Sequence, residues 1–465
     1  MSGFKPYPTY KDSGVEWLGN VPENWPIFPL KRSVDGCVNG LWGDEPDGEN
    51  DIAVIRVADF ERYFSTVGLD KLTYRSITPK ERQSRLIKSG DLLIEKSGGG
   101  EKTLVGCVVS FNHEFEAITS NFVARMRPLA EFNSHFLCYA FSSLYHGRVN
   151  YPSVKQVTGI QNLDAESYLQ ERFSFPGRIE QIQIVRFLDH ETARIDALIE
   201  EQQRLIELLK EKRQAVISHA VTKGLDPTVP MKDSGVEWLG EVPAHWDVTR
   251  LRRICVEIND INHVMPAAVD SGVSFLSAKD LLDDGTLNFT TDIKMISEDD
   301  FKVLSKKILP RRDDIIYSRI GACLGKARLV ETDERFLVSY SCCVIRLIET
   351  IACPRFIQRF LDGEMTLTEA KIRTQGIGVP DLGLGEIGRF PIVLPPKREQ
   401  QQIASYLDDK SKKFDPLIGE AERATNFLRE RRSALISAAV TGKIDVRGWQ
   451  PPAGAPSLES AQEAM

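Results

Sequence analysis

The chain has 465 residues, of which 42% are hydrophobic and 27% charged, a composition typical of soluble globular proteins with roughly three folding units. It has no apolar run near the ~18 residues that span a bilayer, no signal-peptide core in MSGFKPYPTYKDS, and no CxxC pair among its eight cysteines. These features argue against a membrane protein and a zinc ribbon, and we expect a cytoplasmic protein. The net charge of −7 at first argues against nucleic acid, but it averages over local basic clusters.

Residues 1–25 are an N-terminal repeat segment, because the peptide YKDSGVEWLGNVPENW (10–25) returns as MKDSGVEWLGEVPAHW (231–246). A single active site rarely needs two copies of a polar, tryptophan-bearing peptide, whereas a two-fold partner does. We therefore assign Trp17 and Trp238, which occupy matching positions, to partner docking.

Residues 26–177 are predicted to form a first α+β domain, since DIAVIRVADF, TLVGCVVSF and AITSNFVARMRP have strand composition and turn-forming flanks. A basic run (YRSITPKERQSRLIKSGD) and a glycine-rich stretch (IEKSGGGEK) could approach phosphate, but a solvated helical face and a hairpin turn are simpler explanations that stay open. A later loop, which contains Tyr151, Lys155 and Gln156, has residue types that can contact the edges of bases in a DNA groove. The candidate DNA-binding residues are Arg82, Arg85, Lys88, Lys96, Ser97, Gly98, Gly99, Lys102, Tyr151, Lys155 and Gln156.

Residues 178–226 contain a long central helix. Apolar residues recur at three- and four-residue steps, Asp189 or Thr192 can cap the start, and Gly224 ends the pattern. The predicted helical span, 191–222, would be about 48 Å long at 1.5 Å per residue. The narrow stripe contributes Leu198, Leu205 and Leu209 to the candidate docking residues.

Residues 227–246 hold the second tryptophan peptide, and 247–395 are predicted to form a second α+β domain with strands in GVSFLSAKDL, DIIYSRIG, KARLVE and FLVSYSCCVIRLI. GDLLIEKSG in the first domain corresponds weakly to DDIIYSRIG in the second. The matching basic and glycine-rich stretches give the candidate DNA-binding residues Lys306, Lys307, Arg311, Arg312, Arg319, Gly321, Lys326, Arg373 and Gln375.

Residues 396–446 form a distal helix that repeats the central one, since QIASYLDDKSKKFDPLIGEAERATNFLRERRSALISAAVTGKID matches QIVRFLDHETARIDALIEEQQRLIELLKEKRQAVISHAVTKGLD. We expect the two helices to pack together as an antiparallel coiled coil, with two separate surface helices as the alternative. Leu417 and Leu428 complete the docking candidates. Pro416 lacks an N–H and should kink the distal helix or delay its start. We expect 447–465 to be a flexible tail.

No catalytic or cofactor motif is complete. SGGGEKT and GACLGKA miss the spacing of a phosphate loop, and no Asn/Asp-Pro-Pro-Tyr/Phe peptide of an amino-methyltransferase is present. Asp91, Glu95 and Lys96 have the residue types of a metal nuclease, but the matching positions in the second domain are Asp314, Ser318 and Arg319. We therefore expect a non-catalytic chain without a metal or cofactor of its own.

The repeated peptide, the long helix and LIEKSGGG together resemble the specificity subunit of type I restriction–modification systems, over nearly the whole chain. The resemblance implies an α+β fold with two pseudo-two-fold related target-recognition domains separated by two long antiparallel helices. Each domain would read one half of a bipartite double-stranded DNA site.

The same resemblance implies that the helices and repeats dock two adenine-methylating modification subunits, to which restriction subunits attach. S-adenosylmethionine, ATP and magnesium would then be bound by those partners, which could also share the DNA clamp and so offset the negative charge. Two alternatives stay open: a magnesium-dependent nuclease built on Asp91, Glu95 and Lys96, and a coiled-coil scaffold that does not contact DNA.

The circular order of the repeats predicts where the N-terminal peptide lies. The central helix runs directly into the second tryptophan peptide, whereas no such peptide follows the distal helix. The N-terminal copy would complete the set by packing at the end of the distal helix, making 10–25 and 437–446 neighbours. Trp17 and Trp25 would then be buried or face a partner. The alternative is a mobile N-terminal arm.

Overall fold

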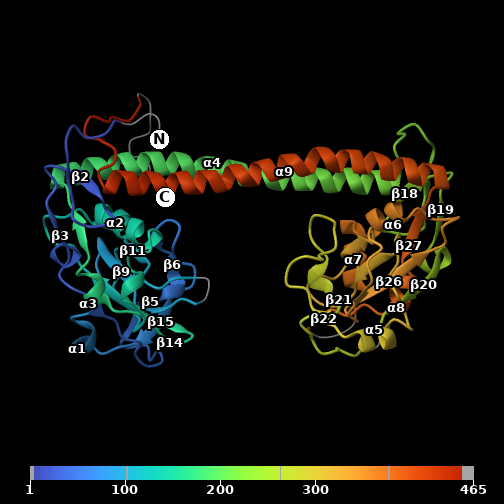
Figure 1. Ribbon diagram of the computed structural model, residues 1–465, viewed down its shortest axis with the longest axis horizontal. Coiled ribbons are helices and arrows are strands. Elements are labelled where there is room, and N and C mark those ends of the chain that lie inside the picture. The colour runs from blue at the N-terminus through green and yellow to red at the C-terminus, as the bar shows by residue number, and fades with distance from the viewer. Residues whose placement is uncertain (1–4, 101–102, 262, 375–377, 453–465) are drawn as a thin grey trace. The chain divides into compact units, whose positions relative to one another are not determined.

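The computed structural model describes residues 5–100, 103–261, 263–374 and 378–452. The chain divides into two compact units: unit 1 comprises Met1–Gln202 with Arg423–Met465, and unit 2 comprises Gln203–Glu422. The two longest helices, α4 (Arg178–Lys223) and α9 (Lys397–Val440), each contribute one half to each unit (Figure 1).

Unit 1 is built from short strands around a small set of helices. Its strands are β1 (Tyr10–Asp12), β2 (Asn20–Pro22), β3 (Ile27–Pro29), β4 (Val38–Asn39), β5 (Asp51–Ile55), β6 (Phe60–Glu61), β7 (Thr66–Val67), β8 (Thr73–Ser76), β9 (Asp91–Glu95), β10 (Ser97–Gly98), β11 (Val108–Phe111), β12 (Ala117–Thr119), β13 (Val123–Met126), β14 (Val154–Thr158), β15 (Ile160–Leu163) and β16 (Arg172–Ser174). Its shorter helices are α1 (Pro79–Arg82), α2 (Ser134–His146) and α3 (Ala165–Tyr168), with 3-10 turns η1 (Leu30–Arg32), η2 (Val57–Asp59) and η3 (Tyr151–Ser153).

The core of unit 1 lies between a six-stranded sheet, in the order β4-β13-β9-β11-β7-β6, and helix α2. Every side chain of β9 is buried: the apolar run Leu92–Ile94 lies between antiparallel neighbours on both sides, and the flanking Asp91 and Glu95 are paired with arginines. Helix α2 begins where the Asn133 side chain accepts a hydrogen bond from the Phe136 N–H, and it buries Phe136 and Phe141 against the sheet. Beside this sheet lie the three-stranded sheets β12-β5-β8 and β10-β15-β14.

Unit 2 repeats this plan with fewer strands. Its strands are β17 (Met231–Asp233), β18 (Glu241–Pro243), β19 (Asp247–Arg250), β20 (Cys255–Asn259), β21 (Val273–Leu276), β22 (Met295–Ile296), β23 (Ile315–Ser318), β24 (Ala327–Leu329), β25 (Phe336–Val338), β26 (Cys342–Leu347) and β27 (Pro391–Leu394). Its shorter helices are α5 (Glu298–Leu304), α6 (Pro354–Leu361), α7 (Glu364–Ile372) and α8 (Leu384–Gly388), with 3-10 turns η4 (Leu251–Ile254) and η5 (Ala278–Asp280). The main sheet has the order β20-β26-β23-β24, and the parallel pair β21-β25 corresponds to β5-β12 in unit 1. The α+β expectation and the predicted strands are confirmed in both units.

Each unit contains buried polar contacts, and these occur at equivalent positions of the two units. Asp91 is held by the Arg127 guanidinium at 2.8 and 2.7 Å, and Asp314 by that of Arg346 at 3.0 and 2.7 Å. In each unit a buried glutamine joins the start of a long helix to the preceding proline carbonyl and to a helix N-terminus. These glutamines are Gln181, bonded to Pro176 and Asn133, and Gln400, bonded to Pro395 and Cys353. Such contacts, which we call framework contacts, use side chains that the repeat places at equivalent positions.

Helix α4 begins earlier than the predicted helical span of 191–222. Helix α4 starts at Arg178, so Asp189 and Thr192 are not caps: Thr192 Oγ1 donates back to the Leu188 carbonyl inside the helix. Pro416 lies inside α9, which starts at Lys397, so the prediction of a delayed start is wrong. Within unit 1 an ion pair joins Asp196 of α4 to Arg432 of α9 at 3.0 Å. The helices therefore pack on each other there, as expected.

The N-terminal peptide packs at the end of the distal helix, as the circular order predicted. Lys443 Nζ donates to the carbonyls of Leu18 (3.0 Å) and Asn20 (2.7 Å), and the Tyr10 hydroxyl donates to the Gly442 carbonyl (3.0 Å). Trp25 is fully buried, and its Nε1 donates to Glu180 at 3.3 Å. The alternative of a mobile arm is therefore wrong for residues 10–25.

The start of the segment that we expected to be a flexible tail is also packed. The ring of Trp449 lies edge-on to Phe187 of α4, and the Trp449 carbonyl accepts a hydrogen bond from Gln183 Nε2 at 2.6 Å. None of the helices in the part of the chain that the structure describes combines the length and apolarity that crossing a bilayer requires.

Candidate nucleic-acid interface

The sheet β10-β15-β14 brings the glycine-rich stretch of unit 1 beside the later loop. Ser97 pairs with Asn162 across the strands, and its Oγ donates to the Asn162 side chain at 2.6 Å. Gly98 and Gly99 have positive φ values, +146° and +65°, which explains why glycine is needed there. Gln161 fixes the stretch, because its amide accepts from the Val105 N–H and donates to the Gly100 carbonyl.

The loop side of this sheet presents an aromatic ring, a cation and an amide to solvent. Tyr151 is 62% exposed, and Lys155 and Gln156 are exposed on β14. Lys155 Nζ lies 2.8 Å from the Asp164 carboxylate and lowers its pKa. This surface has the residue types that contact phosphates and base edges.

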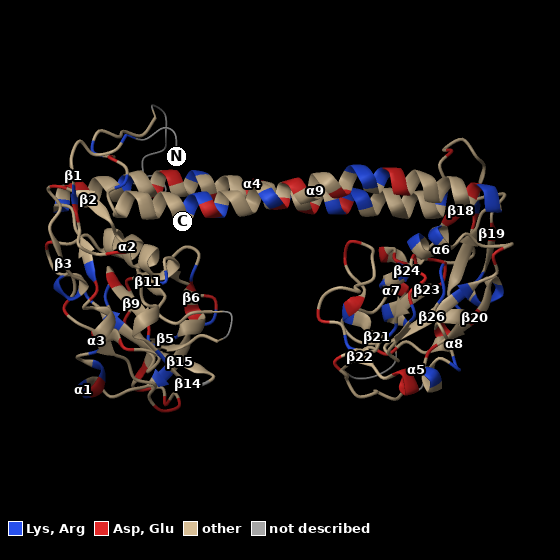
Figure 2. Ribbon diagram, in the orientation of Figure 1, with Lys and Arg blue, Asp and Glu red and all other residues tan. Residues whose placement is uncertain are grey.

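The basic run lies at the same end of unit 1 as β14 and β15 (Figure 1). Thr78 caps α1 by accepting from the Glu81 N–H, and Arg82 and Arg85 are half-buried while Lys88 is exposed. Figure 2 shows acidic residues interspersed with these cations. The surface is therefore of mixed charge, in keeping with the net charge of −7.

Asp91, Glu95 and Lys96, the residues of the nuclease alternative, are each bound to another side chain of the chain. Asp91 is bound by Arg127, as above, Glu95 is fully buried with Arg62 Nη2 at 2.9 Å from Oε1, and Lys96 Nζ donates to the Asn39 side chain at 2.7 Å. A metal ion would have to displace an arginine from each carboxylate. Among the described residues, no three His, Cys, Asp or Glu side chains lie close enough together to hold a metal ion.

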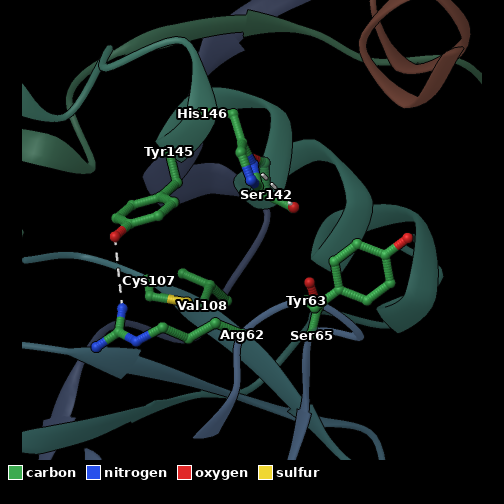
Figure 3. A pocket seen from close by; sticks show the side chains of 8 residues that line it. All are labelled: Arg62, Tyr63, Ser65, Cys107, Val108, Ser142, Tyr145 and His146. Atoms are coloured by element: carbon green, nitrogen blue, oxygen red, sulfur yellow. Dashed lines mark hydrogen bonds between the residues drawn. The ribbon is translucent and has the colours of Figure 1, made fainter. Parts of the chain in front are cut away.

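A small cavity of about 130 Å³ lies next to Arg62, between the β6–β7 turn, β11 and α2 (Figure 3). It is lined by Arg62, Tyr63, Ser65, Cys107, Val108, Ser142, Tyr145 and His146. Burial raises the pKa of the Cys107 thiol to about 11, so this thiol is protonated and a poor nucleophile at neutral pH. The Tyr145 hydroxyl donates to the Leu104 carbonyl at 2.7 Å. The Cys107 thiol of this cavity is therefore not an activated nucleophile.

In unit 2, Arg319 does not lie on the surface as predicted. Its side chain is 5% exposed, and its guanidinium donates to Asp260 and Asp381, each at 2.8 Å. Arg319 and Asp260 correspond to Lys96 and Asn39 of unit 1, so both pairs join the same two strands. We leave Arg319 out of the proposed interface, because moving it would remove one of the two cationic partners, Arg319 and Lys307, of the buried Asp260 carboxylate.

The other candidates of unit 2 differ in exposure. Lys306 and Arg311 are exposed near α5, Gly321 has φ +86°, and its N–H donates to the Pro380 carbonyl. The remaining four cations are in ion pairs: Lys307 with Asp260, Arg312 with Asp333, Lys326 with Asp283, and Arg373 with Glu369. The predicted residues Lys102 and Gln375 lie outside the described residues.

The predicted docking residues are mostly accessible. Trp17 is 38% exposed and stacks on Phe173, and Trp238 is half-buried against Phe360. Leu198, Leu205 and Leu417 are exposed, whereas Leu209 and Leu428 are half-buried.

Two apolar positions recur in both copies of the long helix. Leu198 of α4 matches Leu417 of α9, and Leu208 matches Phe427, and all four side chains are exposed. The sequence analysis missed Leu208 and Phe427, although aligning the repeats shows an apolar residue in each copy.

The ion pairs between the long helices were also missed. Asp196 of α4 contacts Arg432 of α9 in unit 1, and Asp415 contacts Arg213 at 2.7 Å in unit 2. Asp196 aligns with Asp415, and Arg213 aligns with Arg432, when the two helix sequences are superposed. The alignment of the repeats could therefore have predicted both ion pairs. In unit 1 the Tyr63 hydroxyl also donates to Asp196 at 2.5 Å, which ties the recognition domain to the helix.

Comparison with known proteins agrees with this architecture. Residues 256–418 match the family model described as type I restriction modification DNA specificity domain. The putative type I restriction enzyme MjaX specificity subunit of Methanocaldococcus jannaschii is 20% identical over 446 residues, 92% of this chain and 96% of that protein. The type I restriction enzyme EcoKI specificity subunit of Escherichia coli K12 is 22% identical over 452 residues, 93% and 91% of the two chains.

A solved structure described as showing complex assembly and conformational transition of the type I R-M system shares the fold. The TM-score is 0.67 at 14% identity, over 91% of this chain and 99% of that chain. The chain is thus similar, over nearly its whole length, to specificity subunits of type I restriction–modification systems.

Proposed function

We propose that this chain is the DNA specificity subunit of a type I restriction–modification complex, in which each unit reads one half of a bipartite site. The observation that carries the proposal is the duplication itself: framework contacts such as Asp91–Arg127 and Asp314–Arg346 recur, while the exposed residues around them differ. One scaffold used twice with two different surfaces is what reading an asymmetric site requires. The chain carries no catalysis of its own.

In unit 1 the proposed DNA surface is formed by β14 and the neighbouring basic and glycine-rich stretches, with Tyr151, Lys155, Gln156 and Lys88 exposed. In unit 2 it is formed by the residues around α5 and β23, where Lys306 and Arg311 are exposed. Half-buried cations such as Arg82 contribute to the field at the phosphates.

The proposed partners are two modification subunits, which methylate adenine, and the restriction subunits that join them. The repeat gives each unit an exposed apolar pair, Leu198 with Phe427 in unit 1 and Leu208 with Leu417 in unit 2. We propose that these pairs, with Trp17 and Trp238, are equivalent docking faces on an antiparallel coiled coil. S-adenosylmethionine, ATP and magnesium would be bound by the partners. The eight free thiols suit a reducing cytoplasm.

Co-expression with the modification subunits, followed by mapping of methylated adenines, tests the proposal. The expected result is a bipartite motif with a fixed spacer. Replacing residues 247–395 by the corresponding block of another specificity subunit should change one half of the motif and keep the other. A change in both halves would refute independent reading, and a complex that methylates without sequence preference would refute the function.

A further inference from the structure

Two tight turns, one in each unit, are built in the same way. In unit 1 the turn joins β12 to β13, and the Val123 N–H donates to the Ser120 carbonyl at 3.0 Å. In unit 2 the turn joins β25 to β26, and the Cys342 N–H donates to the Ser339 carbonyl at 2.9 Å. Each turn therefore presents two residues at its tip: Asn121–Phe122 and Tyr340–Ser341.

Each turn is also anchored to the strand end that leads into the glycine-rich stretch. In unit 1 the Phe122 carbonyl accepts hydrogen bonds from the Lys96 N–H (2.8 Å) and the Ser97 N–H (3.3 Å). Ser97 is the residue whose Oγ contacts Asn162, so the tip of the turn adjoins the sheet β10-β15-β14 that carries the proposed DNA surface.

Unit 2 repeats this anchor atom for atom. The Ser341 carbonyl accepts from the Arg319 N–H (2.9 Å) and the Ile320 N–H (3.2 Å). Because both anchors use only backbone atoms, the side chains at the tips can change without loss of the anchor. At the tips the backbone hydrogen bonds are therefore the same in both units, whereas the side chains differ.

The tip side chains are accessible to a different degree in the two units. Asn121 is exposed, and Phe122 is 50% exposed although it is large and apolar. Tyr340 and Ser341 are half-buried, and the Tyr340 ring stacks on the exposed His263 ring at 4.6 Å between centroids. Phe122 therefore leaves half of a large apolar side chain in contact with solvent at the tip of the turn.

We propose that these tips read bases: Asn121–Phe122 sets the sequence of the half-site bound by unit 1, and Tyr340–Ser341 that of the half-site bound by unit 2. The inference rests on the proposed function. An asparagine amide matches the N6 and N7 edge of adenine, and an apolar ring contacts the methyl group of thymine. The unit 1 tip therefore selects an A·T base pair.

The test uses the complex with its modification subunits and a DNA library that is randomised in both half-sites. The readout is the relative methylation of each sequence, so that a uniform loss of activity does not affect it. Asn121→Ala and Phe122→Ala should each reduce discrimination about tenfold to a hundredfold at one A·T pair of one half-site, and leave the other half unchanged. Tyr340→Ala should alter only the other half-site.

Two variants serve as controls. Phe64→Ala removes a ring that is 56% exposed in the β6–β7 turn, and it should leave the motif unchanged. Phe122→Leu keeps an apolar contact and should retain most of the discrimination. Assembly of each variant is checked by native mass measurement, and Asn121→Ala decides the question for unit 1 where Phe122→Ala fails to assemble.

The outcomes separate the inference from the function on which it rests. A wild-type complex with no sequence preference overturns both, and this is seen before any variant is compared. A defined wild-type motif that assembled tip variants reproduce at full discrimination overturns the tip inference alone. An altered half-site that Phe64→Ala reproduces also overturns it, because the effect would then follow from the loss of any exposed ring.

Discussion

Replacing Gly442 by alanine should displace the N-terminal repeat segment at the end of α9. Gly442 has φ +73°, and a Cβ atom there would lie 2.4 Å from Pro22 Cδ and 3.2 Å from the Trp25 ring. Atoms that are not bonded do not approach to 2.4 Å, so Pro22 has to move away and Trp25 with it. The backbone conformation itself disfavours a side chain by about 1–2 kcal/mol.

The size of the effect follows from the burial of Trp25. A fully buried tryptophan removes about 150–250 Å² from water, worth roughly 4–6 kcal/mol at about 25 cal/mol per Å². Because the peptide has to shift rather than leave entirely, we expect Gly442→Ala to lower the free energy of unfolding of unit 1 by about 2–4 kcal/mol.

Gly14→Ala is the matched control for this measurement. Gly14 has φ +64°, close to that of Gly442, but a Cβ atom there meets nothing within 4 Å. It should lose only the conformational term of about 1–2 kcal/mol. Denaturant unfolding followed by tryptophan fluorescence compares the two variants. Equal losses would mean that Pro22 does not pack on Gly442, and the docking of the peptide would be refuted.

Four further predictions test other contacts. Asp196→Asn should destabilise the protein by about 1–3 kcal/mol, because Arg432 and Tyr63 both lose a charged acceptor. Asp415→Asn should cost under about 1 kcal/mol, since its pair with Arg213 is exposed. Thermal unfolding compares the two variants, and equal shifts in melting temperature would contradict the contacts. Arg319→Ala should lower the free energy of unfolding by about 3–5 kcal/mol, because the buried Asp260 carboxylate loses one of its partners. The methylated motif should not change. A changed motif at full stability would mean that Arg319 belongs to the DNA interface. Leu198→Asp combined with Phe427→Asp should yield a complex with one modification subunit by native mass spectrometry, and retention of two would exclude the unit 1 face as a docking site. A circular permutant that joins 446 to 10 and opens between 226 and 231 should still assemble with the modification subunits, and a folded permutant that fails to assemble would show that the peptide and the helix need their native order.

The repeated architecture could be predicted well because a repeat is visible in the sequence itself and needs no knowledge of tertiary contacts. The order of peptide, domain and helix, the strand segments and the docking of residues 10–25 are all confirmed. The start of helix α4 was predicted wrongly for a local reason. Asp189 has the chemistry of a cap, yet the apolar period continues upstream through Ile184 and Leu188, and the chain breaks only at Pro176–Gly177.

The candidate DNA surface was harder to predict, because a charge in a sequence does not say whether it is paired. Arg319 and Lys88 both stand in basic stretches, but one is buried between two aspartates and the other is exposed. Asp260 and Asp381 are 59 and 62 residues from Arg319 in the chain, so no local pattern shows the pairing. Phe122 was passed over for the opposite reason, since an apolar residue beside a strand normally belongs to the core.

The two copies of the domain separate residues that hold the fold from residues that can differ freely. The paired arginines and glutamines and the backbone anchors of the turns recur in both units, so a change at any of them has to be matched by its partner. Exposed side chains such as Asn121, Phe122 and Gln156 are not part of these framework contacts, and a substitution there costs little stability. On the proposed function, a new half-site can therefore arise from changes in a few exposed residues of one unit, while the helices and repeated peptides that we propose dock the partners stay the same.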